Sequence, residues 1–172
     1  MRTFFLYLVL ILGAYLVQTV FYPVLLVPEL RVDLFLVILL HFSFYYERSK
    51  ALVMALILGL LMDVGLPMQG CFHPLLYLGI ALLSSLLRQN LNLQSRRYQA
   101  IFVGICTLLE GIGIWAILSL QDTEFAATNY LLRILVWRTI AASLVGPLLL
   151  AGLERLDQWI GDLAELQESQ EA

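Results

Sequence analysis

Residues 98–120 read YQAIFVGICTLLEGIGIWAILSL, a run of 23 residues in which Glu110 is the one acidic or basic side chain. About 20 apolar residues in a helix are enough to cross the hydrocarbon core of a bilayer. A second run of this kind covers residues 130–153, with Arg133 and Arg138 as its charged residues. Both runs predict transmembrane helices, and they indicate that the chain resides in a membrane.

The composition of the whole chain agrees with this prediction. Of its 172 residues, 61% are hydrophobic and 13% are charged, whereas a soluble domain carries roughly a quarter charged residues. Because so few charges cannot cover a water-soluble surface, most of the apolar surface must face lipid or other helices. The length leaves room for about six spans and for no sizeable soluble domain. The net charge of −3 comes mainly from the C-terminal tail and does not suggest binding to nucleic acid.

Four further apolar runs complete the expected set of six spans, at residues 4–27, 34–46, 51–65 and 74–87. The first run continues past the length of a secretory signal and lacks a small-residue cleavage site, so we interpret it as a span. The other three are shorter than usual, which tilting or local thinning of the bilayer would accommodate. The sequence thus predicts an all-α integral membrane protein, a bundle of about six transmembrane helices over residues 1–153.

The remaining residues, 154–172, are predicted to form an acidic cytoplasmic tail. Apolar side chains recur there at helical spacing, at Leu153, Leu156, Ile160, Leu163 and Leu166. Acidic residues lie largely on the other face, which is the pattern of an amphipathic helix, and we expect this helix to continue the sixth span. Its acidic face would be repelled by anionic lipid. We therefore expect this acidic face to contact a partner protein or water, and not the membrane surface.

The distribution of basic residues predicts the orientation, because Lys and Arg concentrate in the cytoplasmic connections of membrane proteins. One side of the expected bundle holds seven basic residues and the other side holds two. The seven are Arg2, Arg48, Lys50, Arg88, Arg96, Arg97 and Arg155, against Arg31 and Arg133. Both the N-terminus and the C-terminus are therefore expected in the cytoplasm, which requires an even number of spans.

Three ionisable side chains lie inside the expected spans at similar estimated depths. With a rise of about 1.5 Å per residue, Asp63 and Glu110 each lie about 20 Å from the cytoplasmic edge, and Arg138 lies about 12 Å below the outer edge. A charge in hydrocarbon is costly unless it faces the bundle interior and finds a partner. We therefore expect a buried cluster in which Arg138 contacts Asp63 or Glu110, with Asp63 preferred. A structural ion pair is favoured over a binding or proton-handling site.

Patterns of catalytic or metal-ligating residues are missing from the sequence, which has no P-loop, G-x-S-x-G, H-E-x-x-H or C-x-x-C motif. His41 and His73 lack a second ligand three or four residues away, which favours hydrogen-bonded neutral histidines over metal ligands. Cys71 and Cys106 fit no metal or disulfide framework and are expected to be small apolar fillers. The chain is therefore expected not to be an enzyme and to hold no cofactor and no metal.

The order of several short motifs resembles the MreD family, the small membrane subunit of the bacterial rod-shape system. These motifs are Arg31-Val32-Asp33-Leu34-Phe35-Leu36-Val37, Glu47-Arg48-Ser49-Lys50-Ala51 and Gly59-Leu60-Leu61-Met62-Asp63, followed by Pro67, Gly70, His73 and Arg88. The family typically opens span two with Pro-Asp-Leu and ends span three with G-L-x-x-D. A loop with proline, glycine and often histidine or asparagine follows, before a Leu-rich span that ends in arginine. Here Val32 replaces the usual proline, and the spacing before His73 is longer.

The resemblance covers about residues 1–155 and implies a non-catalytic, multi-pass scaffold of the bacterial inner (cytoplasmic) membrane. MreD proteins act with MreC, a single-span protein with a periplasmic domain. Together they help couple MreB filaments to the RodA glycosyltransferase and its transpeptidase partner, and so to peptidoglycan synthesis and cell shape. On this basis the outer loop with Pro67, Gly70 and His73 is the expected partner contact.

Two other functions stay open at the level of the sequence. The family fold is similar to the substrate-binding subunits of vitamin transporters, so the alternative is a small-molecule (vitamin) binding subunit of an energy-coupling membrane transporter. That function would need a closed, polar-lined pocket at the outer face. The other hypothesis is a membrane enzyme such as a lipid-modifying acyltransferase. That function would need a nucleophile–base pair, which the sequence lacks.

Overall fold

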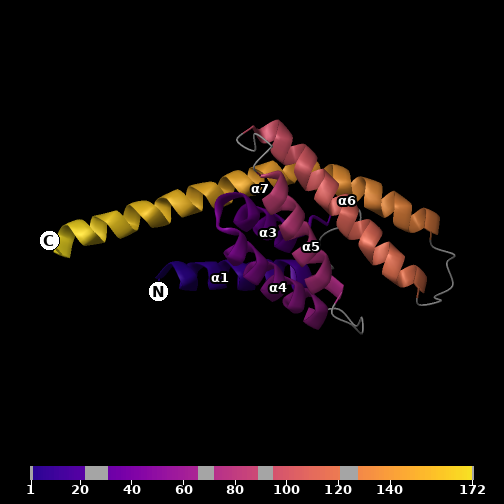
Figure 1. Ribbon diagram of the computed structural model, residues 1–172, viewed down its shortest axis with the longest axis horizontal. Coiled ribbons are helices and arrows are strands. Elements are labelled where there is room, and N and C mark those ends of the chain that lie inside the picture. The colour runs from indigo at the N-terminus through magenta and orange to yellow at the C-terminus, as the bar shows by residue number, and fades with distance from the viewer. Residues whose placement is uncertain (1, 22–30, 66–71, 89–94, 121–127, 172) are drawn as a thin grey trace.

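The computed structural model describes residues 2–21, 31–65, 72–88, 95–120 and 128–171 (Figure 1). Over these residues the chain forms six α-helices and no strand. In chain order they are α1 (Arg2–Leu16), prolonged by the π-helical segment η1 (Val17–Phe21), then α3 (Leu34–Tyr45), α4 (Arg48–Gly65), α5 (Phe72–Leu87), α6 (Arg96–Leu120) and α7 (Thr128–Glu171). Each helix corresponds to one expected span, so the prediction of an all-α fold with six helices is confirmed. The end of the first expected span, residues 22–27, lies outside the described residues.

Two of the described helices contain stretches that are long and apolar enough to cross a membrane. These stretches are Arg96–Ala116 in α6 and Arg133–Trp159 in α7, with 21 and 27 residues. Three other apolar helices, Tyr7–Phe21, Leu34–Tyr45 and Phe72–Leu87, are shorter. Length and composition therefore single out α6 and α7, the two helices whose sequences also predict spans most directly.

Helix α3 lies at the centre of the bundle. Ten of its 12 residues are buried, and apart from His41 and Ser43 they are all apolar. A helix that is apolar on all sides has to be enclosed by other helices, and α3 contacts α1, α4, α5, α6 and α7. Figure 1 shows α3 near the middle of the bundle, with α7 on one side and α4 on the other. The shortest α-helix is thus the one that the others surround.

Helices α4 and α5 approach each other closely at Gly59. A methyl group added there would lie 2.4 Å from Cα and 2.5 Å from N of Pro74. Small residues allow helices to pack at such short range, and a backbone neighbour cannot turn aside as a flexible side chain can. The contact sets the first turn of α5 against the last turns of α4, which brings His73 next to Asp63.

Helices α6 and α7 also pack through glycines. A methyl group on Gly104 would meet Oγ of Ser143 at 2.4 Å, and one on Gly111 would meet Cδ1 of Leu135 at 2.1 Å. The spacing of these two glycines by seven residues places them on one face of α6, two turns apart. This face fixes the register in which α6 and α7 lie against each other.

Helix α7 is one continuous helix of 44 residues. At 1.5 Å per residue it is about 66 Å long, roughly twice the 30 Å core of a bilayer. Its C-terminal part extends away from the other helices (Figure 1). The expected continuation of the sixth span into the tail is therefore observed, and the helix passes the expected boundary at residues 153 and 154 without a break. Glu154 and Asp157, the first acidic residues of the expected tail, bond to Tyr45 and Tyr46 at the end of α3.

Candidate functional site

Five polar side chains meet where η1, α5, α6 and α7 converge on the start of α3. They are Gln18, Asp33, Tyr77, Glu110 and Arg138, and we call them the Arg138 cluster. Nη2 of Arg138 lies 3.3 Å from each carboxylate oxygen of Glu110 and 3.8 Å from Oδ2 of Asp33. One guanidinium therefore serves two carboxyl groups in the interior of the protein.

Asp33 holds its position because it caps the N-terminus of α3. Its Oδ1 accepts hydrogen bonds from the backbone N–H groups of Phe35 at 2.8 Å and Leu36 at 3.2 Å, which are donors that a helix leaves unpaired in its first turn. The same oxygen accepts from Nε2 of Gln18 at 2.7 Å, and Oδ2 accepts from the hydroxyl of Tyr77 at 2.5 Å. Asp33 is therefore buried but well supplied with donors.

Glu110 has fewer partners than Asp33. Its side chain is buried, accepts two hydrogen bonds from Arg138 and is also hydrogen-bonded to the carboxyl group of Asp33. Nε of Arg138 is itself buried without a hydrogen-bond partner in this part of the chain. Burying a charge is costly unless the charge is paired and hydrogen-bonded. The burial of these two side chains consequently depends on the ion pair between Glu110 and Arg138.

The structure brings together two of the three residues expected to form a buried cluster. Arg138 contacts Glu110, but the preferred partner Asp63 lies elsewhere. Oδ1 of Asp63 lies 2.6 Å from Nδ1 of His73. It also accepts a hydrogen bond from the backbone N–H of His73 at 3.4 Å. The preference for Asp63 is therefore wrong. The depth estimate treated the helices as independent rods, whereas the close packing at Gly59 places the start of α5, not α7, beside Asp63.

Asp33 is the charged member of the cluster that sequence reasoning missed, together with the neutral side chains of Gln18 and Tyr77. It stands in a charged break between two expected spans, close to Glu29 and Arg31, where an exposed position is the usual expectation. The signal that could have found it is its place directly before an apolar run, because Asp at such a position typically caps a helix. A capping carboxylate at the start of a central helix is buried as a consequence of that helix being central.

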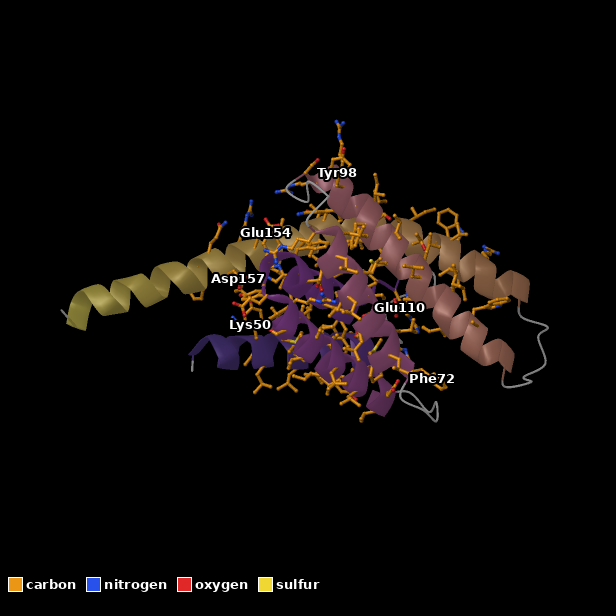
Figure 2. The ribbon with its side chains drawn as sticks, in the orientation of Figure 1. Lys50, Phe72, Tyr98, Glu110, Glu154 and Asp157 are labelled. Atoms are coloured by element: carbon orange, nitrogen blue, oxygen red, sulfur yellow. The ribbon has the colours of Figure 1, made fainter. Side chains whose placement is uncertain are left out.

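A cavity of about 330 Å³ adjoins the Arg138 cluster. Its polar lining consists of Gln18, Arg31, Asp33, His73, Glu110 and Arg138, and apolar side chains complete the wall. Figure 2 shows Glu110 inside the bundle, away from the end at which Asp157 lies. Over the part of the chain that the structure describes, no three His, Cys, Asp or Glu side chains are grouped to hold a metal ion. The chemistry that this arrangement offers is charge pairing and hydrogen bonding.

A second polar cluster joins α7 to α1 and α3 at the end of the bundle opposite Phe72 (Figure 2). Asp157 accepts hydrogen bonds from the hydroxyl groups of Tyr7 and Tyr46, and its Oδ2 lies 2.8 Å from Nε2 of His41. His41 is 1% exposed. The hydrogen bond expected for His41 is therefore made to a carboxylate of the segment expected to be a separate tail.

The residues expected to contact a partner protein divide into two groups. Pro67 and Gly70 lie outside the described residues, as does Cys71. His73 is the second residue of α5, is 2% exposed and pairs with Asp63, which leaves little of its surface for another protein. Cys106 is fully buried, in agreement with its expected place in the apolar interior.

Comparison of the chain with family models, with curated proteins and with solved structures gives no match. The resemblance to MreD therefore stays a prediction from the sequence motifs.

Proposed function

We propose that this chain is a non-catalytic scaffold of the bacterial inner membrane that binds a single-span, MreC-like protein and helps to organise peptidoglycan synthesis during cell elongation. Through that protein it is linked to RodA, to the transpeptidase partner of RodA and to MreB filaments. The proposal rests on the motif residues between Asp33 and Arg88, whose order along the sequence resembles that of the MreD family.

The contacts of these motif residues support the proposal. Asp33 caps α3, Gly59 sets α4 against α5, and Asp63 pairs with the second residue of α5. Arg88, just after α5, donates from Nη1 to the backbone carbonyl of Tyr46 at 2.8 Å. Each of these residues acts at a junction between helices. A scaffold has to present a fixed outer surface to its partners, and residues that fix helix junctions serve that purpose.

The outer surface of the bundle favours lipid as its surroundings. Large apolar side chains point outward from α4, α6 and α7 and are 45–70% exposed, for example Leu56, Leu60, Ile101, Ile105, Leu144 and Leu148. Soluble monomers rarely expose contiguous apolar patches larger than a few hundred Å², whereas a helix satisfies its own backbone groups in lipid. In this proposal all six helices lie in the inner membrane, and the basic residues put both termini in the cytoplasm.

Affinity purification from native membranes tests the proposal. The tagged full-length chain is expected to recover one single-span protein with a periplasmic domain, reproducibly and well above the amount recovered with an unrelated inner-membrane protein that carries the same tag. The physical reason is that a partner helix can pack on the exposed apolar faces of the bundle, as small residues and apolar surface allow. Recovery of the chain alone in repeated purifications would contradict the scaffold.

The charged cavity favours a second candidate, a small-molecule binding subunit of an energy-coupling transporter. Ligand pockets measure about 300–1,000 Å³, and the cavity beside the Arg138 cluster, at about 330 Å³, falls at the lower end of this range. The same purification separates the two candidates. Transporter ATPases among the recovered chains, in place of a single-span protein, would favour the transporter subunit.

A further inference from the structure

An apolar groove lies between α1 and α7, and α3 forms its floor. Its volume is about 400 Å³, and every residue of its lining is apolar or glycine. Leu10 and Ala14 line it from α1, Val37 from α3, and Leu149 and Gly152 from α7. Figure 1 shows α1 and α7 on either side of α3, toward the end of the bundle at which both termini lie. A surface of this composition takes an apolar occupant.

Gly152 leaves the α7 wall of the groove open. No atom of the described residues lies within 4 Å of a carbon added to Gly152, and Leu148, one turn earlier, is 65% exposed. Gly146 in the same helix differs, because a carbon added there would lie 2.7 Å from Cγ1 of Val103 in α6. Glycines allow helices to approach closely. Gly146 serves that purpose within the chain, whereas Gly152 leaves its space to another molecule.

The dimensions of the groove match the side chains along one face of a helix. A water molecule occupies about 30 Å³ in the liquid, so a volume of about 400 Å³ holds on the order of a dozen non-hydrogen atoms, as many as three leucine side chains contain. The α1 wall extends from Leu10 to Val17 and the α7 wall from Leu148 to Leu156, which is about 10–12 Å at 1.5 Å per residue. Side chains at positions i, i+4 and i+7 of a helix lie on one face and cover the same length.

Acidic residues gather where α7 leaves the groove. Between Glu154 and the C-terminus the sequence holds six acidic residues and a single basic one, Arg155. Asp157 is fixed beside the groove, because it accepts hydrogen bonds from Tyr7 of α1 and from Tyr46 just after α3. In the proposed orientation this end is cytoplasmic, and the acidic side chains repel anionic lipid headgroups. Lysine and arginine, which membrane helices carry at their cytoplasmic ends, are attracted instead.

A second apolar groove lies between α5 and α6 and has the opposite charge at its cytoplasmic end. Its volume is about 390 Å³, and its lining includes Leu75, Gly79 and Leu109. Basic residues flank its cytoplasmic end, namely Arg88 just after α5 and Arg96 and Arg97 at the start of α6. Basic residues attract anionic lipid headgroups. The two grooves are thus nearly equal in size, and charge favours lipid in this one and a helix with a basic end between α1 and α7.

We propose that the groove between α1 and α7 is the docking site for the membrane-spanning helix of a partner protein that carries lysine or arginine at its cytoplasmic end. Side chains on one face of that helix fill the space at Gly152, and its basic end lies beside the acidic part of α7. The inference rests on the proposed function, because it names the surface that receives the single-span partner.

Photo-crosslinking of the full chain in phosphatidylcholine vesicles tests the site. The probe is a synthetic helix of about 20 leucine and alanine residues, long enough to span the bilayer, with a photoreactive residue at its middle and four lysines at one end. A matched probe carries four glutamates in place of the lysines. We expect the adducts to map to residues 10–17 and 148–156, and to be several-fold more abundant with the lysine probe. High salt is expected to reduce that difference, because it screens charges.

Two variants connect the adducts to the groove. Gly152→Leu fills the open space without altering a charge and is expected to abolish the adducts on α1 and α7. Its midpoint of thermal unfolding should be unchanged or higher, because leucine favours a helix over glycine. Gly79→Leu makes the same change in the groove between α5 and α6 and should leave the adducts in place. If Gly152→Leu fails to fold, the comparison of the two probes on the unaltered chain decides the test.

Three outcomes would overturn the docking site. The first is equal labelling of the unaltered chain by the lysine and the glutamate probes. The second is labelling that persists in a folded Gly152→Leu variant or that maps mainly to α5 and α6. The third is a lack of adducts with both probes, which would leave the groove to lipid chains. Recovery of a single-span protein by affinity purification, together with any of these outcomes, would refute the groove and leave the scaffold standing.

Discussion

Replacing Arg138 by leucine is expected to remove most of the folded protein from the membrane. The change leaves the carboxyl groups of Asp33 and Glu110 buried without the guanidinium nitrogen that lies 3.8 Å and 3.3 Å from them. Breaking a buried ion pair by removing one partner costs about 3–5 kcal/mol, a large part of the total stability of about 5–15 kcal/mol that is usual for folded proteins. The same substitution at Arg133, an exposed residue of the same helix, is expected to have little effect and is the matched control.

Neutralising the acidic partner is expected to recover much of that loss. In the double variant Glu110→Gln with Arg138→Leu, Asp33 is the remaining carboxylate of the cluster, and it keeps the donors that already surround it. Replacing both members of a buried pair by neutral groups often costs little, even where removing one member is severe. The amount of protein in the membrane and the midpoint of thermal unfolding in detergent measure the effect. Equal losses in the single and the double variant would show that these charges are not coupled.

The second large effect is expected at Gly59. In Gly59→Ala the new methyl group would lie 2.4 Å from Cα of Pro74, and neither backbone can yield without moving its helix. Overpacking of this kind costs about 1–3 kcal/mol and occasionally more, and here it also separates Asp63 from His73. Gly79→Ala makes the same change in α5, where no atom lies within 4 Å of the added carbon. That variant is expected to be neutral or slightly stabilising, because alanine favours a helix by about 0.8–1.0 kcal/mol over glycine.

Thermal unfolding of the two glycine variants in the same detergent measures the difference. A lower midpoint for Gly59→Ala beside an unchanged or higher midpoint for Gly79→Ala is the expected result. Equal midpoints would mean that α4 and α5 do not meet as closely at Gly59 as their backbones indicate, and the contact between Asp63 and His73 would then lack its structural basis.

The positions of the helices could be predicted from the sequence because charged residues and helix breakers separate the apolar runs. Helix α4 begins within the charged stretch 47–50, shortly after α3 ends at Tyr45, and α6 begins within the polar stretch 88–97 that follows α5. Within long apolar runs, a single charge must find a partner inside the protein. This reasoning applies to Glu110 and Arg138, each a rare charge in one of two consecutive long helices, and their contact is the part of the site that sequence reasoning reached.

The rest of the site depends on which helices pack against each other. The hydrophobic periodicity and the spacing of motifs along the sequence do not determine that packing. Asp33 enters the Arg138 cluster because α3 is enclosed by its neighbours, and Asp63 leaves the expected cluster because Gly59 draws α5 toward α4. The contact of His41 with Asp157 joins residues 116 positions apart and crosses the expected boundary of the tail. Each of these contacts follows from a choice of neighbours in three dimensions.

A reporter enzyme that is active only outside the cytoplasm tests the six-helix membrane bundle most directly. Fused after Ala172, it is expected to be silent, because six crossings from a cytoplasmic N-terminus return the C-terminus to the cytoplasm, as the basic residues indicate. Inserted within residues 121–127, between α6 and α7, the same reporter is expected to be active. Strong activity of the fusion at Ala172 would contradict both the orientation and the number of crossings.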